Sequence, residues 1–175
     1  MTYGPLRRLA CILALALLST SCVSSQGGRW QERLALSGRV EFVAEFRRFD
    51  PAGHSLVYCQ GGHLCLVDGY PVFGTEGSVP KVEVVSLTVV VDGRPVPLEH
   101  KGMYNPWSPV EGRTLAVDLV EGTPDEFRVR GEFSDGAAAY VAEWSVAGHG
   151  SARVLLDCVE CLQESCTKRF GPVAR

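Results

Sequence analysis

The stretch "EFRVRGEFSDGAAAYVAEWSV", residues 126–146, decides the fold because it predicts a β-hairpin with a defined register. Apolar residues alternate with charged ones before and after Asp135-Gly136, which we take as the turn. This turn sets four pairs on one face: Phe133 with Ala138, Gly131 with Tyr140, Val129 with Ala142, and Phe127 with Trp144. A slip of one residue would move all of them to the other face. The stretch therefore predicts two antiparallel strands that share one buried face.

Three segments outside this hairpin also have the residue pattern of strands. Residues 40–46, "VEFVAEF", place apolar side chains on one face and two glutamates on the other, which is typical of a half-buried strand. The apolar face consists of Val40, Phe42, Ala44 and Phe46. Residues 114–120 and 151–157 are rich in β-branched and aliphatic residues and have glycines close by. Short strands between turn residues indicate an antiparallel fold.

Residues 81–99 predict a second hairpin and its place in a sheet. A long β-branched run precedes Asp92-Gly93 and an extended segment follows it, which favours a type I′ turn. Pro95 and Pro97 have no N–H to donate, so the returning strand belongs at a sheet edge. Altogether the sequence predicts an all-β fold, an antiparallel β-sandwich or barrel of about eight or nine strands with a short C-terminal helix.

The N-terminus has the features of a secretory signal peptide. Arg7 and Arg8 lie in a segment without acidic residues, an apolar run extends from Leu9 to Leu18, and small residues follow it. The apolar run is shorter than the ~20 residues that a membrane-spanning helix needs. We therefore expect residues 1–21 to be removed during export.

The residues that end this segment, "STSC" (19–22), resemble the lipobox of bacterial lipoproteins, although Ser19 stands where that motif has an aliphatic residue. The resemblance implies cleavage before Cys22, a lipid on that cysteine and attachment to the membrane through acyl chains. By the same resemblance, Val23 implies an outer-membrane lipoprotein that faces the periplasm. The small residues before Cys22 also fit an ordinary cleavage site, so secretion to the periplasm is the alternative. The mature chain resembles no family known to us.

The mature chain has the length of one domain, and its charge excludes one class of partner. We expect a tether over residues 22–33, a β domain over 34–157 and a cysteine-rich segment over 158–175. The chain has 17 Lys and Arg against 20 Asp and Glu, and removal of the signal peptide takes away two arginines. Such an acidic domain lacks the basic surface that nucleic acid requires, so we expect no nucleic-acid partner.

The segment "SLVYCQGGHLCLVD", residues 55–68, predicts a hairpin closed by a disulfide. Disulfides are the default for cysteines outside the cytoplasm. A loop of odd length centred on Gly62 places Cys59 directly opposite Cys65, which brings the two Cβ atoms into disulfide range. The alternative is a pair of separate buried thiols.

The segment "CVECLQESC", residues 158–166, leaves several chemistries open. A helix there would gather Cys158, Cys161 and Cys166 near one face. A structural disulfide, within this cluster or from it to the body of the domain, is the simplest expectation. Cys-x-x-Cys after a strand resembles the motif of thiol–disulfide oxidoreductases, which implies redox activity as one alternative. The three cysteines with His149 form a candidate Cys₃His zinc site, the other alternative.

Two loops carry aromatic residues beside Gly and Pro. They are residues 102–109, with Tyr104 and Trp107, and residues 68–74, with Tyr70 and Phe73. Aromatic side chains in restrained loops lose little entropy on binding, which suits recognition of a partner. The alternative is that they fill the open ends of the fold. The sequence contains no nucleophile elbow, phosphate-binding loop or zinc-protease motif, and its four histidines lie in separate segments.

From these features we expect an exported envelope protein, lipid-anchored at Cys22, that acts as a non-enzymatic binding or interaction module without a cofactor. Its partners would be the membrane, through the lipid, and another envelope protein. One alternative is a thiol-redox or metal-dependent enzyme that uses the C-terminal cysteines. The other is a secreted inhibitor of a hydrolase, which requires a protruding loop.

Overall fold

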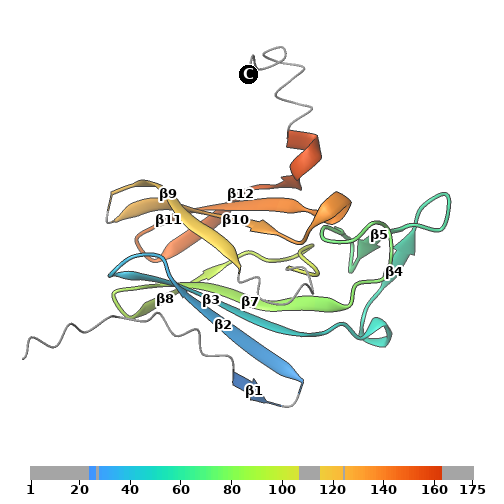
Figure 1. The fold of residues 1–175 in the computed structure, drawn as a ribbon, viewed down its shortest axis with the longest axis horizontal. Coiled ribbons are helices and arrows are strands. Elements are labelled where there is room, and N and C mark those ends of the chain that lie inside the picture. The colour runs from blue at the N-terminus through green and yellow to red at the C-terminus, as the bar shows by residue number, and fades with distance from the viewer. Residues whose placement is uncertain (1–23, 27, 107–114, 124, 163–175) are drawn as a thin grey trace, which may run out of the picture.

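The computed structural model describes residues 24–26, 28–106, 115–123 and 125–162. These residues form an all-β fold with twelve antiparallel strands in three open sheets (Figure 1). The prediction of an antiparallel all-β fold is confirmed. Of its two alternatives, sandwich or barrel, the described strands do not form a closed barrel. The strands outnumber the predicted eight or nine because three are too short to leave a sequence pattern. They are β1 (Ser24–Gln26), β4 (Leu56–Tyr58) and β6 (Tyr70–Pro71).

The first sheet has five strands in the order β1-β2-β3-β7-β8. Besides β1, these are β2 (Arg29–Ala35), β3 (Val40–Arg48), β7 (Val82–Val91) and β8 (Arg94–Leu98). Asp92 and Gly93 join β7 to β8 with φ of 48° and 79°, positive at both residues as a type I′ turn requires. The strand with Pro95 and Pro97, β8, lies at the edge of this sheet, as predicted.

The second sheet has four strands in the order β12-β11-β10-β9. They are β9 (Ala116–Gly122), β10 (Glu126–Phe133), β11 (Tyr140–Ala147) and β12 (Gly150–Cys158). The predicted hairpin is present as β10 and β11, but its register is wrong by two residues, since Phe133 pairs with Tyr140. The connection is longer than Asp135-Gly136 because Gly136–Ala138 forms a 3₁₀ turn, η2. A shift of two residues keeps every side chain on its predicted face.

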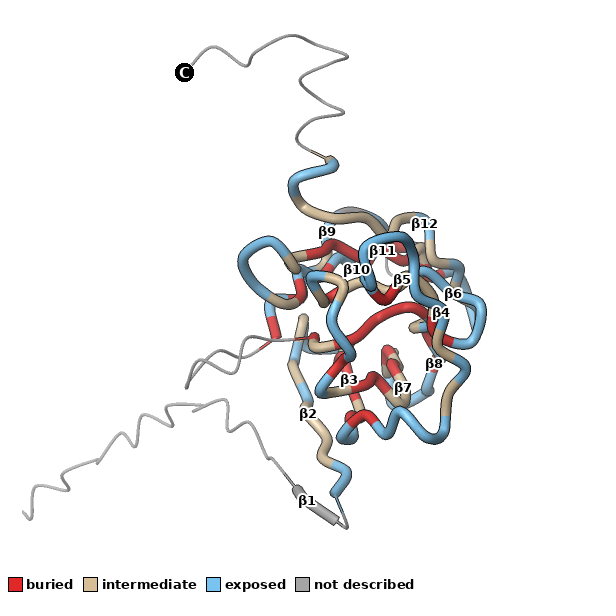
Figure 2. The backbone as a smooth tube through the Cα atoms, turned by 90° about the vertical axis from the view of Figure 1, so that its right-hand side faces the viewer, coloured by how far each residue is buried: buried red, intermediate tan, exposed pale blue. Residues whose placement is uncertain are grey.

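The main core lies between these two sheets, where Figure 2 shows buried backbone through the centre of the molecule. The largest fully buried side chains are Trp144, Tyr140, Phe42, Phe46 and Phe133, all from faces predicted to be buried. Trp144 Nε1 donates to the Glu99 carbonyl at 2.8 Å, and the Tyr140 hydroxyl donates to the Tyr104 carbonyl at 3.1 Å. These two hydrogen bonds satisfy the polar atoms of the buried rings and fix the orientation of the rings.

The third sheet, in the order β4-β5-β6, lies at the right end of the molecule in Figure 1. Its central strand is β5 (Leu64–Val67), and the 3₁₀ turn η1 (Pro51–Gly53) leads into it from β3 through β4. It has a small core of its own, formed by Phe49, Leu64, Val67 and Tyr104. The third sheet therefore packs as an appendage with its own apolar contacts.

The two ends of the described chain differ in how well they were predicted. A short helix over residues 159–162 follows β12, in agreement with the prediction. Residues 29–33, however, belong to β2 and not to a tether, because Trp30 packs against the core, with its ring centroid 6.2 Å from that of Phe46. Within the described residues, no helix combines the length and hydropathy that crossing a membrane would need.

Candidate functional site

A disulfide closes the hairpin formed by β4 and β5. Cys59 and Cys65 are joined, with their Cα atoms 5.8 Å apart, so the structure contains the predicted pair. The backbone pairing differs from the prediction, because the Cys59 N–H donates to the carbonyl of His63 at 2.8 Å. Cys65 is the extra residue of a β-bulge, between the paired residues Leu64 and Leu66. A bulge redirects the side chain of its extra residue, and here it allows the bond to Cys59.

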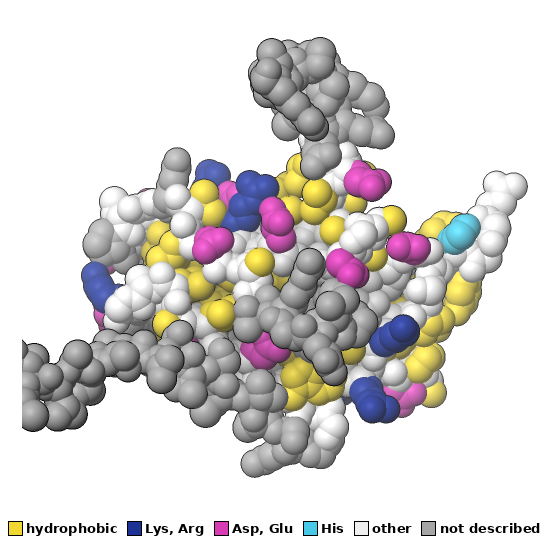
Figure 3. All heavy atoms as spheres, viewed as in Figure 1, with side chains coloured by type: hydrophobic (Ala, Val, Ile, Leu, Met, Phe, Trp, Pro, Cys, Tyr) yellow, Lys and Arg dark blue, Asp and Glu magenta, His cyan; other side chains and the backbone are white. Residues whose placement is uncertain are grey.

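This hairpin projects from the molecule and carries exposed apolar side chains. In Figure 1 the loop between β4 and β5 extends beyond the strands around it, and Figure 3 shows the same end as a narrow projection. Val57 and Tyr58 are 45% and 52% exposed. Residues 55–67 contain no Asp, Glu, Lys or Arg. An exposed, apolar and uncharged projection is a candidate contact with another molecule.

Four ionisable side chains form a continuous chain, called here the ionic chain, at the base of the hairpin. Arg47 of β3 donates through Nε to Oε1 of Glu83 on β7. His54 lies between two carboxylates, with Nε2 2.9 Å from Glu83 Oε2 and Nδ1 2.7 Å from Asp68 Oδ2. The His54 ring stacks on Phe49 with the centroids 4.7 Å apart, and Glu83 is buried. Because both ring nitrogens face carboxylate oxygens, the imidazolium form can donate to both.

Asp68 ties the two arms of the hairpin together where they leave the body of the protein. Its carboxylate accepts from the Ser55 N–H at 2.9 Å, and its own N–H donates to the Ser55 carbonyl at 2.9 Å. The hydrogen bond from His54, followed by that from the Ser55 N–H, holds the pKa of Asp68 below its ordinary value. The ionic chain therefore links the hairpin to the five-stranded sheet.

The ionic chain lines a hollow of about 250 Å³ that His100 and Lys101 also border. No Ser, Thr or Cys lies among the described residues that line it. Both carboxylate oxygens of Glu83 and both ring nitrogens of His54 already have partners. The four groups of the ionic chain are therefore occupied by one another, which suits a structural link.

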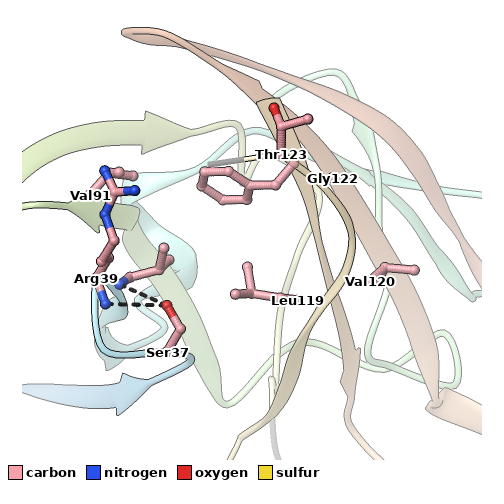
Figure 4. Close-up of a pocket in the computed structure, with 9 residues that line it drawn as sticks. Ser37, Arg39, Val91, Leu119, Val120, Gly122 and Thr123 are labelled. Atoms are coloured by element: carbon pink, nitrogen blue, oxygen red, sulfur yellow. Dashed lines mark hydrogen bonds between the residues drawn. The ribbon is translucent and has the colours of Figure 1, made fainter. Parts of the chain in front are cut away.

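An apolar cleft of about 420 Å³ lies at the other end of β3, between the two main sheets. Val40, Val91, Leu119 and Phe127 line it. Figure 4 shows Leu119 between the turn with Ser37 and Arg39 on one side and Val120 on the other. No carboxylate or imidazole lies among the described residues that line it, so none of these supplies a base to the hydroxyls present. The geometry of this cleft suits apolar contact.

Arg39 lies at the rim of the cleft and is already paired. Its Nε donates to Asp92 Oδ1 at 2.9 Å, and a second nitrogen of the guanidinium contacts Oδ2. This bidentate contact is the main reason why the pKa of Asp92 lies below its ordinary value. The rim therefore presents a neutralised ion pair to an incoming group.

Of the four aromatic residues predicted to recognise a partner, the structure describes three, and these do not form one exposed surface. Tyr104 is only 8% exposed and belongs to the small core, so its predicted recognition role is wrong. Phe73 packs against the main core, with its ring centroid 6.1 Å from that of Tyr140. Tyr70 is exposed, and its hydroxyl accepts from Lys101 Nζ at 2.9 Å. Trp107 lies outside the described residues.

Two of the C-terminal cysteines, Cys158 and Cys161, form a disulfide. Cys158 and Cys161 are joined, with their Cα atoms 5.1 Å apart, and sulfur atoms in a disulfide are not the thiolates that bind zinc. His149 is exposed in the turn before β12, whereas Cys158 ends that strand, on the order of 25 Å away. The predicted zinc set with His149 is therefore wrong. Cys22 and Cys166 lie outside the described residues.

Sequence reasoning missed the residues of the ionic chain and the exposed residues of the hairpin. Arg47, His54, Asp68 and Glu83 come from four separate segments, so no spacing links them. His54 looks like an isolated loop residue until the fold brings two carboxylates to it. Val57 and Tyr58 look like core residues of a strand, and only the position of β4 outside the main sheets exposes them.

A scan against protein-family models and searches of curated proteins and solved structures find no match to this chain.

Proposed function

We propose that this protein is an exported envelope protein, lipid-anchored at Cys22, that acts as a non-enzymatic interaction module. Its contact element is the disulfide-closed hairpin of residues 55–68. The exposure of Val57 and Tyr58 on an uncharged projection carries this proposal. Apolar and aromatic groups contribute most to binding when a partner's cleft removes them from water, and covalent closure reduces the entropy lost on binding.

The disulfides and the N-terminal sequence support export. Cys59–Cys65 and Cys158–Cys161 are both oxidised, and such bonds persist in compartments outside the reducing cytoplasm. Residues 1–21 have the charge and apolar pattern of a signal peptide, and the resemblance of "STSC" to a lipobox supports lipidation of Cys22. Export and a rigid contact element are both consistent with the proposed role as an envelope interaction module.

The chemistry of the two hollows supports binding over catalysis. The groups of the ionic chain already bond to one another, and the described residues that line the apolar cleft include no base. Groups that already bond to one another, and hydroxyls without a base beside them, favour binding over hydrolytic or transfer chemistry.

Inhibition of a hydrolase is the second candidate function, because the structure contains the protruding loop that this activity requires. A hairpin fixed by Cys59–Cys65 and by the ionic chain can enter an active-site cleft without rearrangement. In that case Val57 or Tyr58 would occupy the apolar subsite of the hydrolase. This candidate uses the same contact element and differs only in the kind of partner.

Photocrosslinking from the hairpin tests the proposal. A photoreactive phenylalanine analogue replaces Tyr58 or, as the control, Val154 of β12, which is 51% exposed. We expect one discrete protein adduct from position 58 and none from position 154. The captured partner is then titrated with Tyr58→Ala, which we expect to bind about tenfold more weakly or worse, and with Val154→Ala, which we expect to bind normally.

Three outcomes would contradict the proposal. Equal adducts from both positions would indicate random collision. Adducts with lipid alone would indicate that the hairpin contacts a membrane. Normal affinity of Tyr58→Ala for the captured protein would remove the hairpin from the interface.

A further inference from the structure

The outer side of β9 is an open sheet edge. β9 is the last strand of the four-stranded sheet, and within the described residues no strand pairs with its other side. Leu115, which precedes it, donates its N–H to the carboxylate of Glu32 on β2. At the other end of the strand, the apolar cleft separates β9 from the turn between β2 and β3. Backbone donors and acceptors along such an edge can pair with another chain.

β8 and β12, the other long edge strands, carry features that protect them from pairing, and β9 shows none of these features within the described residues. β8 carries Pro95 and Pro97, which cannot donate to a neighbouring strand. β12 is tied to the opposite sheet, because Ser151 Oγ donates to the Pro97 carbonyl and Arg153 donates to the Lys101 carbonyl. β9 contains no proline and no lysine, the residues that natural proteins most often use to block an edge.

The alternation of β9 defines what a neighbouring strand must present on each face. Val117 and Leu119 point to the core side, and Leu119 borders the apolar cleft. Asp118 and Val120 point outward and are exposed. An extended segment beside β9 would direct alternate side chains into the cleft and the others to the outer face. The side chains that enter the cleft must be apolar.

The charged residues around β9 indicate which side chains are favoured on the outer face of the sheet. Asp118 on the strand and Asp125 and Glu126 after it are exposed, and residues 115–127 contain no Lys or Arg. The basic neighbour of Asp118 is Arg130, its pair on β10, whose guanidinium also lies 4.0 Å from Glu143. Arg39, across the cleft, is occupied by Asp92. Opposite charges stabilise cross-strand pairs, so a basic side chain next to Asp118 is favoured and an acidic one is not.

We propose that β9 and the apolar cleft bind an extended segment of a partner protein that alternates apolar and basic residues. The segment adds a strand to the four-stranded sheet through backbone hydrogen bonds, inserts its apolar side chains between the sheets, and places its basic side chains near Asp118. This site is separate from the hairpin, at the opposite end of β3, and it does not depend on the function proposed for the hairpin.

A synthetic peptide that alternates lysine with valine or leucine over about seven residues is the probe. In titrations of the mature protein followed by NMR, we expect saturable binding with amide shifts concentrated in residues 115–123. A peptide of the same composition without alternation, and one with glutamate for lysine, should each bind about tenfold more weakly or worse.

Exposed charge variants give the matched control. Asp118→Lys should lose the lysine peptide and gain the glutamate peptide, whereas Glu76→Lys, an equal charge change at a distant exposed site, should leave both unchanged. Both substitutions are at exposed positions, and the retained NMR spectrum of each variant verifies folding.

Several results would overturn the proposal. Equal binding of the alternating and non-alternating peptides would show unspecific charge attraction. Absence of saturation, or shifts confined to the hairpin, would exclude the edge. Tighter peptide binding after deletion of residues 163–175 would show that the chain's own C-terminus occupies the site, and a peptide-sensitive dimer would show that a second copy does.

Discussion

At the scale of single residues, Gly74 holds a backbone position that no other residue fits. Its φ is +90°, and a Cβ added there would lie 1.8 Å from the carbonyl oxygen of Tyr104. We expect Gly74→Ala to lower the free energy of unfolding by about 3 kcal/mol, because the loop must move away from Tyr104 and Tyr140. Urea denaturation measures the change.

Gly62→Ala is the matched control for Gly74→Ala. Gly62 also has a positive φ, +80°, but an added Cβ there meets no atom within 4 Å. Only the conformational cost remains, about 1 kcal/mol. Equal losses for the two variants would show that the close approach to Tyr104 does not matter.

Asp68 gives the ionic chain a defined dependence on pH. Because the pKa of Asp68 is lowered in the folded protein, its contribution to stability is present above the ordinary carboxyl pKa of about 4 and is lost as pH falls through the lowered value. We expect the wild type to exceed Asp68→Asn in stability at pH 5, and this difference to disappear towards pH 2. Urea midpoints over this range measure it.

The control for Asp68→Asn is Glu76→Gln, an exposed carboxyl outside the ionic chain. The urea midpoint of Glu76→Gln should stay close to that of the wild type at each pH. A difference for Asp68→Asn that stays constant down to pH 2 would mean that the contact with His54 does not stabilise the fold.

At the scale of elements, the disulfide determines how rigid the β4–β5 hairpin is. We expect Cys59→Ser/Cys65→Ser to lower the free energy of unfolding by about 2 kcal/mol, since the bond closes a short loop. Hydrogen exchange should quicken in residues 56–67 and remain unchanged in β10 and β11. Unchanged exchange in the hairpin would mean that the ionic chain and the small core hold it alone.

The Cys158→Ser/Cys161→Ser variant tests whether this effect is specific to the hairpin. That bond closes a shorter loop at the end of β12, so it should stabilise less and leave exchange in residues 56–67 unchanged.

Elements with a strong local signal could be predicted from the sequence. The alternation in residues 40–46 identified the buried face of β3, and Asp92-Gly93 identified the β7–β8 turn. In both cases neighbouring residues carry all the information, because side-chain alternation and positive φ are local properties.

Features that depend on distant contacts could not be predicted. The register of β10 and β11 differs by two residues from the predicted one. Tyr140 stacks on Phe133, with centroids 5.3 Å apart, and the 3₁₀ turn Gly136–Ala138 accommodates the additional residues of the connection. The bulge at Cys65 inserts one residue without any sequence marker. The ionic chain around His54 needs four segments to be folded before it exists. The exposure of the hairpin and the edge position of β9 therefore became visible only in the structure.

At the scale of the whole molecule, the two proposed contact surfaces lie at opposite ends of β3, the hairpin beyond Arg47 and the cleft beside Val40. Their separation implies that two partners can bind at once without direct competition. The proposed anchor at Cys22 would hold both surfaces near the membrane from which the chain extends.

Lipid attachment is tested on the whole exported protein. We expect the mature wild type to begin at Cys22, with a mass that exceeds the polypeptide mass by its acyl groups, and to partition into detergent. Cys22→Ser should lose the added mass and the partitioning. Intact mass spectrometry measures both forms, and a wild-type mass without acyl groups would favour plain secretion from the site at Ser19-Thr20-Ser21.

The sequence separation of six residues between Cys59 and Cys65 has a consequence for how the molecule assembles. A chain that leaves the cytoplasm as an unfolded thread delivers both sulfur atoms to the oxidising side almost together. Short loops close in well under a microsecond, whereas pairing of β3 with β7 must await some forty residues of chain. Oxidation therefore does not have to wait for the pairing of β3 with β7, and its rate depends on the oxidant that the chain meets outside the cytoplasm.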